Sequence, residues 1–368
     1  MKIAILGTRG IPNYYGGFEQ FAEFFSVFLA QNNHDVFVYS SHNHVYKENT
    51  FNGVNIIHRY DPEYLISTAG QFIYDLNCII DARSRNFDII LQLGYTSNSI
   101  WSFLLPKKAI IITNMDGLEW KRTKYSKIVQ SALQYAEKLA VQSSDYLISD
   151  SVGIQSYLQK KYNKSSIYIA YGATLFSDPN AQILDNYAVE PQKYNMILAR
   201  MEPENNIDMV LEGVVSSNDK TTMLVIGNHQ TKYGAYLKLK FKDCAHIKFL
   251  GGIYNLNHLD NLRFFSKLYF HGHTVGGTNP SLLEAMASGA LIAAHQNEFN
   301  QSILQQNAFY FTTALDVKVI LETTQKQNNS SFISNNFTAI QNLFNWKKIN
   351  EQYLQLFIDC CSKGKIRN

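Results

Sequence analysis

Cysteine is scarce in this chain of 368 residues, which contains 4 Cys. Cys78, Cys244, Cys360 and Cys361 form no C-x-x-C pair and no spacing typical of a zinc site. A disulfide framework is therefore not expected. Reduced thiols in a cytoplasmic protein are the simplest interpretation.

Long apolar runs are also missing. No stretch of 18 apolar residues occurs, so no segment is expected to span a bilayer. The apolar opening, residues 1–7, is too short for a signal peptide and ends in a glycine turn. We therefore expect a cytoplasmic protein.

Charge is sparse and nearly balanced. Charged residues make up 17% of the chain, and 33 Lys+Arg face 30 Asp+Glu, which leaves a net charge of +3. A surplus this small does not support nucleic-acid binding.

Several sequence motifs of common enzyme classes are absent. The chain has no G-x-x-x-x-G-K-[ST], which excludes a P-loop NTPase, and no G-x-S-x-G nucleophile elbow. It has no D-x-D, the pair on which metal-dependent nucleotide-sugar sites rely. The glycines after the first strand do not read G-x-G-x-x-G, which disfavours a dinucleotide dehydrogenase.

Apolar and aromatic residues are plentiful. Hydrophobic residues make up 46% of the chain, with 23 Tyr and 23 Phe, so a sizeable core is available. Aromatic richness of this kind indicates dense packing or a surface that meets sugars, lipids or partners. The chain is also longer than a single core usually supports, which favours two domains.

Short apolar runs alternate with amphipathic segments along the whole chain. Strands are predicted at 2–6, 36–39, 54–58, 89–93, 109–113 and 146–149, then at 196–199, 223–226, 247–250, 268–270 and 291–294. Helices are predicted after Gly16 and Gly17, over 127–142, 207–215 and 282–288, and over 344–357. This alternation predicts an α/β protein with two Rossmann-like, doubly wound domains that face each other across a cleft.

Composition sets the expected boundaries of these domains. The first domain is placed at 1–172, a polar linker at 173–192, the second domain at 193–345 and a C-terminal helix at 346–368. This helix either packs on the second domain or crosses back to the first. The polar tract 325–330 is expected to be a loop.

Two glycine-containing turns follow predicted strands and precede helices. The first contains Arg9 and ends at Gly16 and Gly17. A glycine turn before a helix favours anion binding, although the glycines also suit a turn that needs positive φ. Arg9 favours a functional turn, because it would otherwise be an unpaired charge at a buried strand end.

The second turn lies between His271 and Glu284. Asn279 is a predicted N-cap and Pro280 suits the first helical position. The backbone amides of residues 278–281 are expected to hold a diphosphate, and Glu284 to accept hydrogen bonds from a ribose. For the two histidines, His271 and His273, the alternatives are a hydrogen-bonded pair and a metal site, although the sequence offers no evident third ligand.

Two further loops that follow predicted strands contain candidate binding and catalytic residues. Arg200 follows the strand at 196–199, where its planar guanidinium is suited to phosphate oxygens. The alternative is an ion pair with Glu202.

In the loop after 109–113, Asp116 and Glu119 are carboxylates suited to sugar hydroxyls, and Trp120 is suited to stacking on a pyranose. The alternative for this loop is a set of surface charges. The loop continues into a basic run of Lys121, Arg122, Lys124 and Lys127. These residues either contact anionic lipid headgroups or form the solvent-exposed start of a helix.

These motifs resemble those of the family-four retaining glycosyltransferases, which have the GT-B fold. The similarity extends to a bacterial subgroup that includes rhamnosyltransferases of capsule and exopolysaccharide synthesis. It rests on the segments 7–12 with 15–19, 114–122, 203–206 and 271–286, which occur in the expected order and span nearly the whole chain.

The resemblance implies transfer of a sugar, with retention, from a nucleoside diphosphate to a saccharide acceptor that is free or linked to a lipid diphosphate. dTDP-L-rhamnose is the expected donor. No metal or other cofactor is expected. Glu284 matches the second glutamate of the family's E-x7-E pair, whereas Gly276 stands in place of the first. Asn205 stands where many members have lysine, which weakens the charge around the phosphates.

The complete set of predicted site residues follows from these motifs. Asp116, Arg200 and Glu284 are predicted to act in catalysis, and Arg9, Tyr15, Glu119 and Trp120 to bind the acceptor on the first domain. The second domain is expected to hold the donor. Predicted donor contacts are Gly16, Gly17, Arg200, Asn205, Gly227, His271, Gly277, Thr278, Asn279 and Glu284. The alternative functions are a nucleotide-sugar 2-epimerase of the same architecture and a non-catalytic carbohydrate-binding protein.

Overall fold

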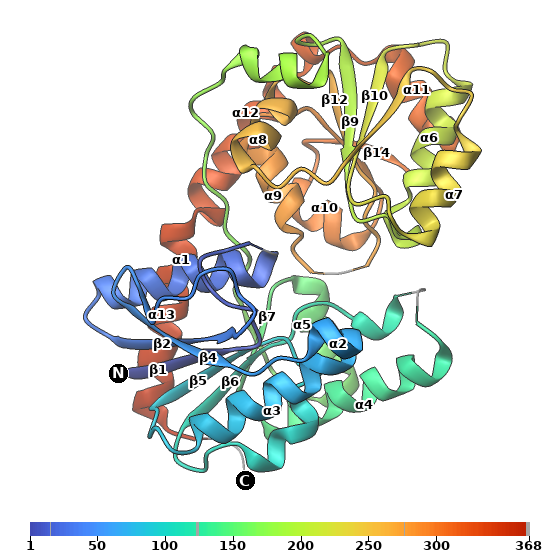
Figure 1. The fold of residues 1–368 in the computed structure, drawn as a ribbon. Helices are drawn as coiled ribbons and strands as arrows, with labels where there is room; N and C mark the ends of the chain where they lie inside the picture. Colours follow the sequence, from blue (N-terminus) through green and yellow to red (C-terminus); the bar gives the residue numbers. More distant parts are fainter. Residues whose placement is uncertain (15, 123–124, 276, 366–368) are drawn as a thin grey trace. The chain divides into compact units, whose positions relative to one another are not determined.

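The computed structural model describes residues 1–14, 16–122, 125–275 and 277–365. The chain forms two compact units, shown in Figure 1. Unit 1 holds the described residues of 1–121, 125–171 and 346–365. Unit 2 holds those of 172–345, together with Arg122.

Unit 1 is built on an eight-stranded sheet with the order β3-β4-β2-β1-β5-β6-β7-β8. All neighbouring strands are parallel except β3 and β4. The strands are β1 (Lys2–Leu6), β2 (Asp35–Ser41), β3 (Thr50–Phe51), β4 (Val54–Arg59), β5 (Ile89–Leu93), β6 (Ile110–Asn114), β7 (Tyr146–Ser149) and β8 (Ile167–Tyr168). The central strands β5 and β6 are buried along their whole length and are mostly apolar, because helices cover both faces of the sheet.

The helices of unit 1 form two layers. α1 and α13 cover one face of the sheet, and α3 and α4 cover the other (Figure 1). η2 packs against α3 and α4. Their bounds are α1 (Gly17–Gln31), α2 (Glu63–Ile66), η1 (Ser67–Ala69), α3 (Gly70–Ala82), η2 (Ser99–Leu104), η3 (Glu119–Lys121), α4 (Lys127–Ser143), α5 (Val152–Tyr162) and α13 (Trp346–Lys363).

The C-terminal helix α13 belongs to unit 1. Its Tyr353 ring lies 4.7 Å from that of Phe21 in α1, and its Phe357 ring lies 5.4 Å from that of Phe25. Aromatic pairs at these separations contribute packing energy beyond the area that they bury. The chain therefore leaves unit 1 after β8 and returns to it at its end.

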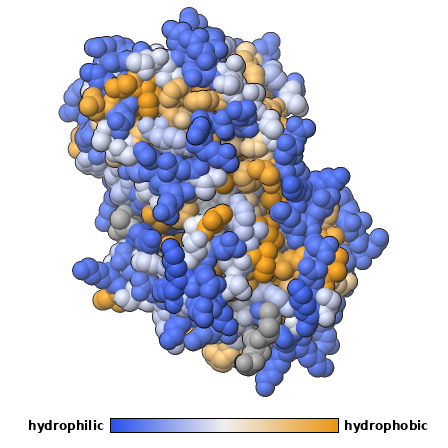
Figure 2. Space-filling model, turned by 180° about the vertical axis from the view of Figure 1, so that it is seen from behind, coloured by the Kyte–Doolittle hydropathy of each residue, from blue (hydrophilic) through white to orange (hydrophobic). Residues whose placement is uncertain are grey.

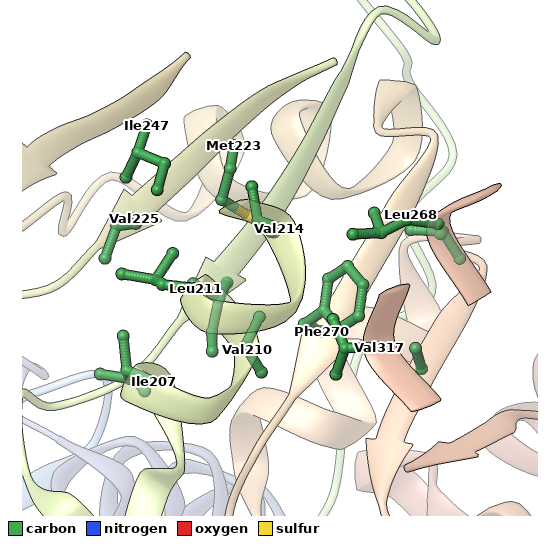
Figure 3. Close-up of a cluster of buried hydrophobic side chains, with 14 of the residues drawn as sticks. Ile207, Val210, Leu211, Val214, Met223, Val225, Ile247, Leu268, Phe270 and Val317 are labelled. Atoms are coloured by element: carbon green, nitrogen blue, oxygen red, sulfur yellow. The ribbon is translucent and has the colours of Figure 1, made fainter. Parts of the chain in front are cut away.

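Unit 2 has a six-stranded parallel sheet with the order β11-β10-β9-β12-β13-β14. The strands are β9 (Tyr194–Leu198), β10 (Thr222–Ile226), β11 (Ile247–Gly251), β12 (Leu268–His271), β13 (Ile292–His295) and β14 (Phe309–Phe311). Figure 3 shows how α6 presents Ile207, Val210, Leu211 and Val214 to the sheet. Their i, i+3, i+4, i+7 spacing places one apolar face of the helix against the strands.

Helices also cover both faces of this second sheet. α6, α7 and α11 lie on one face, and α8, α9 and α12 lie on the other (Figure 1). The bounds are η4 (Ala181–Tyr187), η5 (Pro203–Asn205), α6 (Ile207–Ser216), α7 (Lys232–Lys240), α8 (Leu256–Phe265), α9 (Pro280–Ala287), α10 (Glu298–Leu304), α11 (Ala314–Thr323), η6 (Lys326–Asn329), α12 (Ser330–Ala339) and η7 (Ile340–Phe344).

Two segments expected to be irregular contain helical turns. The expected linker includes the 3-10 helix η4, whose Leu184 is buried. The polar tract 325–330 forms η6 and the start of α12, so the loop prediction there is wrong. Polar side chains do not prevent a helix from forming when an apolar face elsewhere in the segment packs on the core.

The molecular surface carries scattered apolar residues. Figure 2 shows one face on which hydrophobic groups lie between hydrophilic ones. Across the part of the chain that the structure describes, no helix is both long enough and apolar enough to cross a membrane.

Candidate functional site

The loops after β9, β10 and β12 approach each other closely at one edge of the unit 2 sheet. A Cβ atom on Gly227 would lie 2.0 Å from the carbonyl oxygen of Ala199, and one on Gly272 would lie 2.0 Å from the carbonyl oxygen of Asn205. Glycine is required at both positions because side chains would collide with backbone. The edge where these parallel strands end is the part of such a sheet that binds ligands.

The turn around η5 fixes the loop that carries Arg200. The Asn205 side chain is buried and donates from Nδ2 to the carbonyl oxygen of Arg200 at 2.7 Å. Asn206 has a φ of 49° and donates from Nδ2 to the carbonyl oxygen of Gly272 at 2.7 Å. The side-chain amide of Asn205 therefore holds the loop that carries Arg200. The predicted contact of Asn205 with the donor stays a prediction.

The side chain of Arg200 is open to solvent. It is 63% exposed, and its Nε lies 3.9 Å from Oε2 of Glu202. This is the ion pair considered from the sequence, but an exposed contact of this length is weak. A guanidinium in this state remains able to bind phosphate oxygens.

His271 and His273 stack at the end of β12. Their ring centroids are 4.4 Å apart and the rings are inclined by 17°. Burial lowers the pKa of His271 well below its usual value, and burial together with nearby Arg200 lowers the pKa of His273 to about 3. Within the described chain, neither ring nitrogen of His271 has a hydrogen-bond partner, so the hydrogen-bonded pair considered from the sequence is wrong.

Two asparagines that the sequence analysis missed hold the histidine loop. Asn297 and Asn300 each donate from Nδ2 to the carbonyl oxygen of His273, at 2.9 and 3.1 Å. Asn297 is also the N-cap of α10. The N-cap position was the available signal, since asparagine before an amphipathic segment is typical of a helix start.

The N-terminus of α9 has the predicted cap. Asn279 accepts a hydrogen bond from the Ser281 amide at 3.0 Å, and Pro280 occupies the first turn. The amide of Leu282 donates to the carbonyl oxygen of Asn279. The cap uses the Ser281 amide and proline has no amide hydrogen, while the binding of a diphosphate by the backbone amides of 278–281 stays a prediction.

Glu284 lies in the second turn of α9 and forms an ion pair. Its Oε2 accepts a hydrogen bond from Nη2 of Arg263 at 2.6 Å, and the Arg263 side chain is 0% exposed. The sequence analysis missed Arg263, because helix α8 was not predicted and a single arginine carries no local signal.

In unit 1, the glycine turn after β1 is held by carboxylates. Arg9 forms a two-pronged ion pair with Glu63, at 2.8 Å from Nε and 2.7 Å from Nη2. The Arg9 amide donates to the buried Glu19 at 2.8 Å. The charge of Arg9 therefore has a partner in unit 1, which removes the reason for assigning this turn a function.

The second part of the turn leads into α1. Gly16 is the extended N-cap residue and Gly17 the first residue of the helix, with the Gly17 carbonyl accepting a hydrogen bond from the Tyr171 hydroxyl. Tyr15, predicted to contact the acceptor, lies outside the described residues, as do Lys124 and Gly276.

Trp120 is anchored by a buried carboxylate. Its Nε1 donates to Oε2 of Glu137 at 3.1 Å, and the Lys161 ammonium lies 5.3 Å from its ring centre. Glu137 also accepts hydrogen bonds from Tyr157, Tyr162 and Lys161, at 2.8, 2.6 and 2.9 Å. Asp116 and Glu119 lie half-buried in the same loop after β6. The predicted acceptor stacking on Trp120 is untested, and Lys161 already contacts this ring.

No group of three His, Cys, Asp or Glu side chains suited to a metal occurs among the residues with described structure. The expectation of a metal-independent site stays a prediction.

Comparisons with known proteins agree with the architecture. Residues 1–174 match a family described as a domain of unknown function, DUF1972. No curated protein matches the sequence. Among solved structures, sucrose-phosphate synthase from Thermosynechococcus elongatus has a TM-score of 0.80 and 14% identity, over 99% of this chain and 100% of its own.

Two other similar structures are glycosyltransferases or bind a nucleotide sugar. HepE of Anabaena, in complex with UDP-glucose, has a TM-score of 0.77 and 16% identity over 98% of this chain and 100% of its own. A glycosyltransferase from Rickettsia africae has a TM-score of 0.68 and 14% identity over 99% of this chain and 100% of its own. The two parallel-sheet units and these likenesses show that the chain has the GT-B fold.

Proposed function

We propose that this protein is a glycosyltransferase that moves a sugar from a nucleoside diphosphate to an acceptor hydroxyl. The observation that carries the proposal is the edge of unit 2, where exposed Arg200 and the N-terminus of α9 occur in a chain with the GT-B fold. An arginine fork and a helix N-terminus are both suited to a diphosphate.

The chemistry follows from where charge develops. The bond between the anomeric carbon and the diphosphate breaks, a bond to the acceptor oxygen forms, and the acceptor proton passes to the leaving phosphate. Negative charge grows on the diphosphate, where Arg200 and the α9 N-terminus stabilise it. His271 and His273 stay neutral near neutral pH, because burial lowers the pKa of both rings. Retention of configuration is proposed from the resemblance, with Asp116 as a catalytic contact.

We propose L-rhamnose from dTDP-rhamnose as the donor sugar. The support is the subgroup resemblance and the glycine at position 276, where most family members have a glutamate for the donor sugar. A different sugar contact is needed here, and Gly277, Thr278 and Asn279 are the nearest described residues able to supply it.

The proposed acceptor is a saccharide, free or lipid-linked, in cell-surface polysaccharide synthesis. We further propose that unit 1 touches an anionic membrane surface through α4. Ile128 and Tyr135 on α4 are 83% and 60% exposed, beside exposed Lys127 and Lys138, while its one carboxylate, Glu137, is buried. Exposed apolar and basic residues on one helix suit the lipid interface.

A thermal-shift panel tests the proposed function. The ligands are dTDP-rhamnose, UDP-glucose, UDP-N-acetylglucosamine, GDP-mannose and GDP-fucose, with and without magnesium. A ligand that binds the native state raises the melting temperature, and we expect the largest rise with dTDP-rhamnose. No rise with any nucleotide sugar contradicts the proposal and favours a carbohydrate-binding protein. Conversion of a bound donor to its 2-epimer without acceptor identifies an epimerase instead.

A further inference from the structure

A small cavity lies on the α3 face of strand β4, near the edge of the unit 1 sheet. Phe37 of β2 and Ile57 of β4 belong to the apolar cluster that packs against α3. Strand alternation places Asn55 and Arg59, two residues to either side of Ile57, on the same face. The cavity has a volume of about 400 Å³, which is within the range of small-molecule sites. Among the described residues, its lining includes Arg59 and Arg85 and no carboxylate.

The carboxylate of Asp81 holds both of these arginines. Its Oδ1 accepts hydrogen bonds from Nη2 of Arg59 and Nη2 of Arg85. Its Oδ2 accepts from Nε of Arg85 and, at 2.8 Å, from the Tyr39 hydroxyl. A carboxylate has about four lone-pair sites, and these four donors occupy them. Asp81 therefore fixes two guanidinium groups in position but supplies one negative charge against their two positive charges.

Each guanidinium group keeps a donor that the chain does not use. Nε of Arg59 and Nη1 of Arg85 make no hydrogen bond to any residue that the structure describes. Nη1 of Arg59 donates to the carbonyl oxygen of His58 at 2.9 Å. The side chains of Arg59 and Arg85 are 30% and 34% exposed, so a ligand from solvent can reach both.

The charges around the cavity also favour an anion. The Lys2 ammonium lies 5.3 Å from the ring centre of Phe37, which lines the cavity. The side chains of Asp35 and Asp88 are exposed and do not line it. Water screens exposed carboxylates of this kind, so they offset the charge of the paired arginines only weakly.

We propose that this cavity binds the phosphate group of a small phosphate ester through Arg59 and Arg85. A guanidinium group matches phosphate oxygens, and the contacts with Asp81 already order both side chains. The cavity is larger than a phosphate ion, and Asn49 and Thr50 supply polar side chains that bind hydroxyl groups. The ligand is therefore a hydroxylated ester, either a free sugar phosphate or the glycerol phosphate of a lipid headgroup. All of these residues belong to unit 1, and the inference does not depend on glycosyl transfer.

Methyl NMR on the full-length protein tests this site. Ile57 lines the cavity, so its methyl signal reports binding there, and the buried Ile207 of unit 2 is the reference. The probes are glucose 6-phosphate, dihexanoyl phosphatidylglycerol below its micellar concentration, and glucose. We expect a phosphate ester to shift the Ile57 signal at millimolar concentration. Glucose should leave the signal unchanged, because it offers no charge to the two arginines. The ester that binds more tightly identifies a free phosphate or a lipid headgroup as the source.

Charge variants show whether the two arginines hold the ester. Arg59→Gln and Arg85→Gln should each weaken its binding at least about tenfold, because each removes a charged donor. Arg83→Gln removes the same charge from an exposed position that does not line the cavity, and it should change the affinity less than about twofold. Thr50→Glu leaves every contact of Asp81 in place and adds a carboxylate at the cavity. It should also weaken binding about tenfold, which keeps the test decisive if an arginine variant fails to fold.

Three results overturn the inference. The first is an Ile57 signal that neither ester shifts even at high millimolar concentration. The second is an equal loss of affinity in Arg59→Gln, Arg85→Gln and Arg83→Gln, which means that the ester responds to overall charge and not to a built site. The third is binding of glucose as tight as that of glucose 6-phosphate, which means that the phosphate group is not recognised.

Discussion

Protonation of His273 allows a quantitative prediction of stability. Burial, with the charge of Arg200 beside it, lowers the pKa of His273 from 6.5 to about 3. Below pH 6.5 this histidine is protonated in the unfolded chain but stays neutral in the native state. Its contribution to the free energy of unfolding is therefore fully present above pH 6.5. Stability is then lost as the pH falls toward the folded value. Between pH 7.5 and pH 5.0 this one group should lower the free energy of unfolding by about 2 kcal/mol.

The assay compares wild type with His273→Asn. Urea unfolding of unit 2 is measured at both pH values, and the variant should lose about 2 kcal/mol less than wild type on acidification. The histidine ring protons are followed in parallel by NMR, where the His273 signal should stay constant from pH 8 to pH 5. A His273 signal that titrates near pH 6.5, or a variant with the wild-type pH dependence, refutes the reasoning.

Three further changes test other parts of the account. Arg200→Ala should lower kcat for sugar transfer by about a hundredfold with an unchanged melting temperature, because it removes a cation from the leaving diphosphate. Full activity of the folded variant would remove its assigned role. Glu137→Gln should cost about 3 kcal/mol in urea unfolding, since Lys161 and two tyrosine hydroxyls lose the charge of their buried acceptor. The matched change Glu212→Gln, at an exposed position of α6, should cost under about 0.5 kcal/mol. Gly272→Ala should lower the melting temperature of unit 2 and weaken nucleotide binding, because its Cβ would lie 2.0 Å from the Asn205 carbonyl oxygen; a wild-type melting curve would contradict that packing.

Much of the fold could be predicted because buried parallel strands are continuous apolar runs. The strands at 2–6, 89–93 and 146–149 match β1, β5 and β7 at both ends. Helix α3 was missed, although its buried Tyr74, Cys78 and Ile79 share one face. The short strands β3, β8 and β14 pair at or near sheet edges and carry too few residues for a recognisable period.

The candidate site could be predicted where a motif is local. Asn279 and Pro280 act as a cap because capping depends on neighbouring residues, and the structure confirms it. Ion pairs between distant segments leave no such pattern. The Arg9 partner, Glu63, lies 54 residues away, and the Glu284 partner, Arg263, lies 21 residues away in an unpredicted helix. Only the folded chain reveals which charges are already paired.

The stacked histidines show the same limit at shorter range. The spacing of His271 and His273 in a strand end suggested hydrogen bonding or metal binding. Burial instead keeps both rings neutral and face to face. Desolvation depends on the surrounding core, which the two residues do not encode by themselves.

The central claim is that the edge of unit 2 binds the diphosphate of a nucleotide, and hydrogen exchange with and without dTDP tests it most directly. The account predicts slower exchange in the loops 199–206 and 271–279, with helix α4 of unit 1 unchanged. Exchange in both loops that is unaffected by saturating dTDP, or protection confined to unit 1, would contradict it.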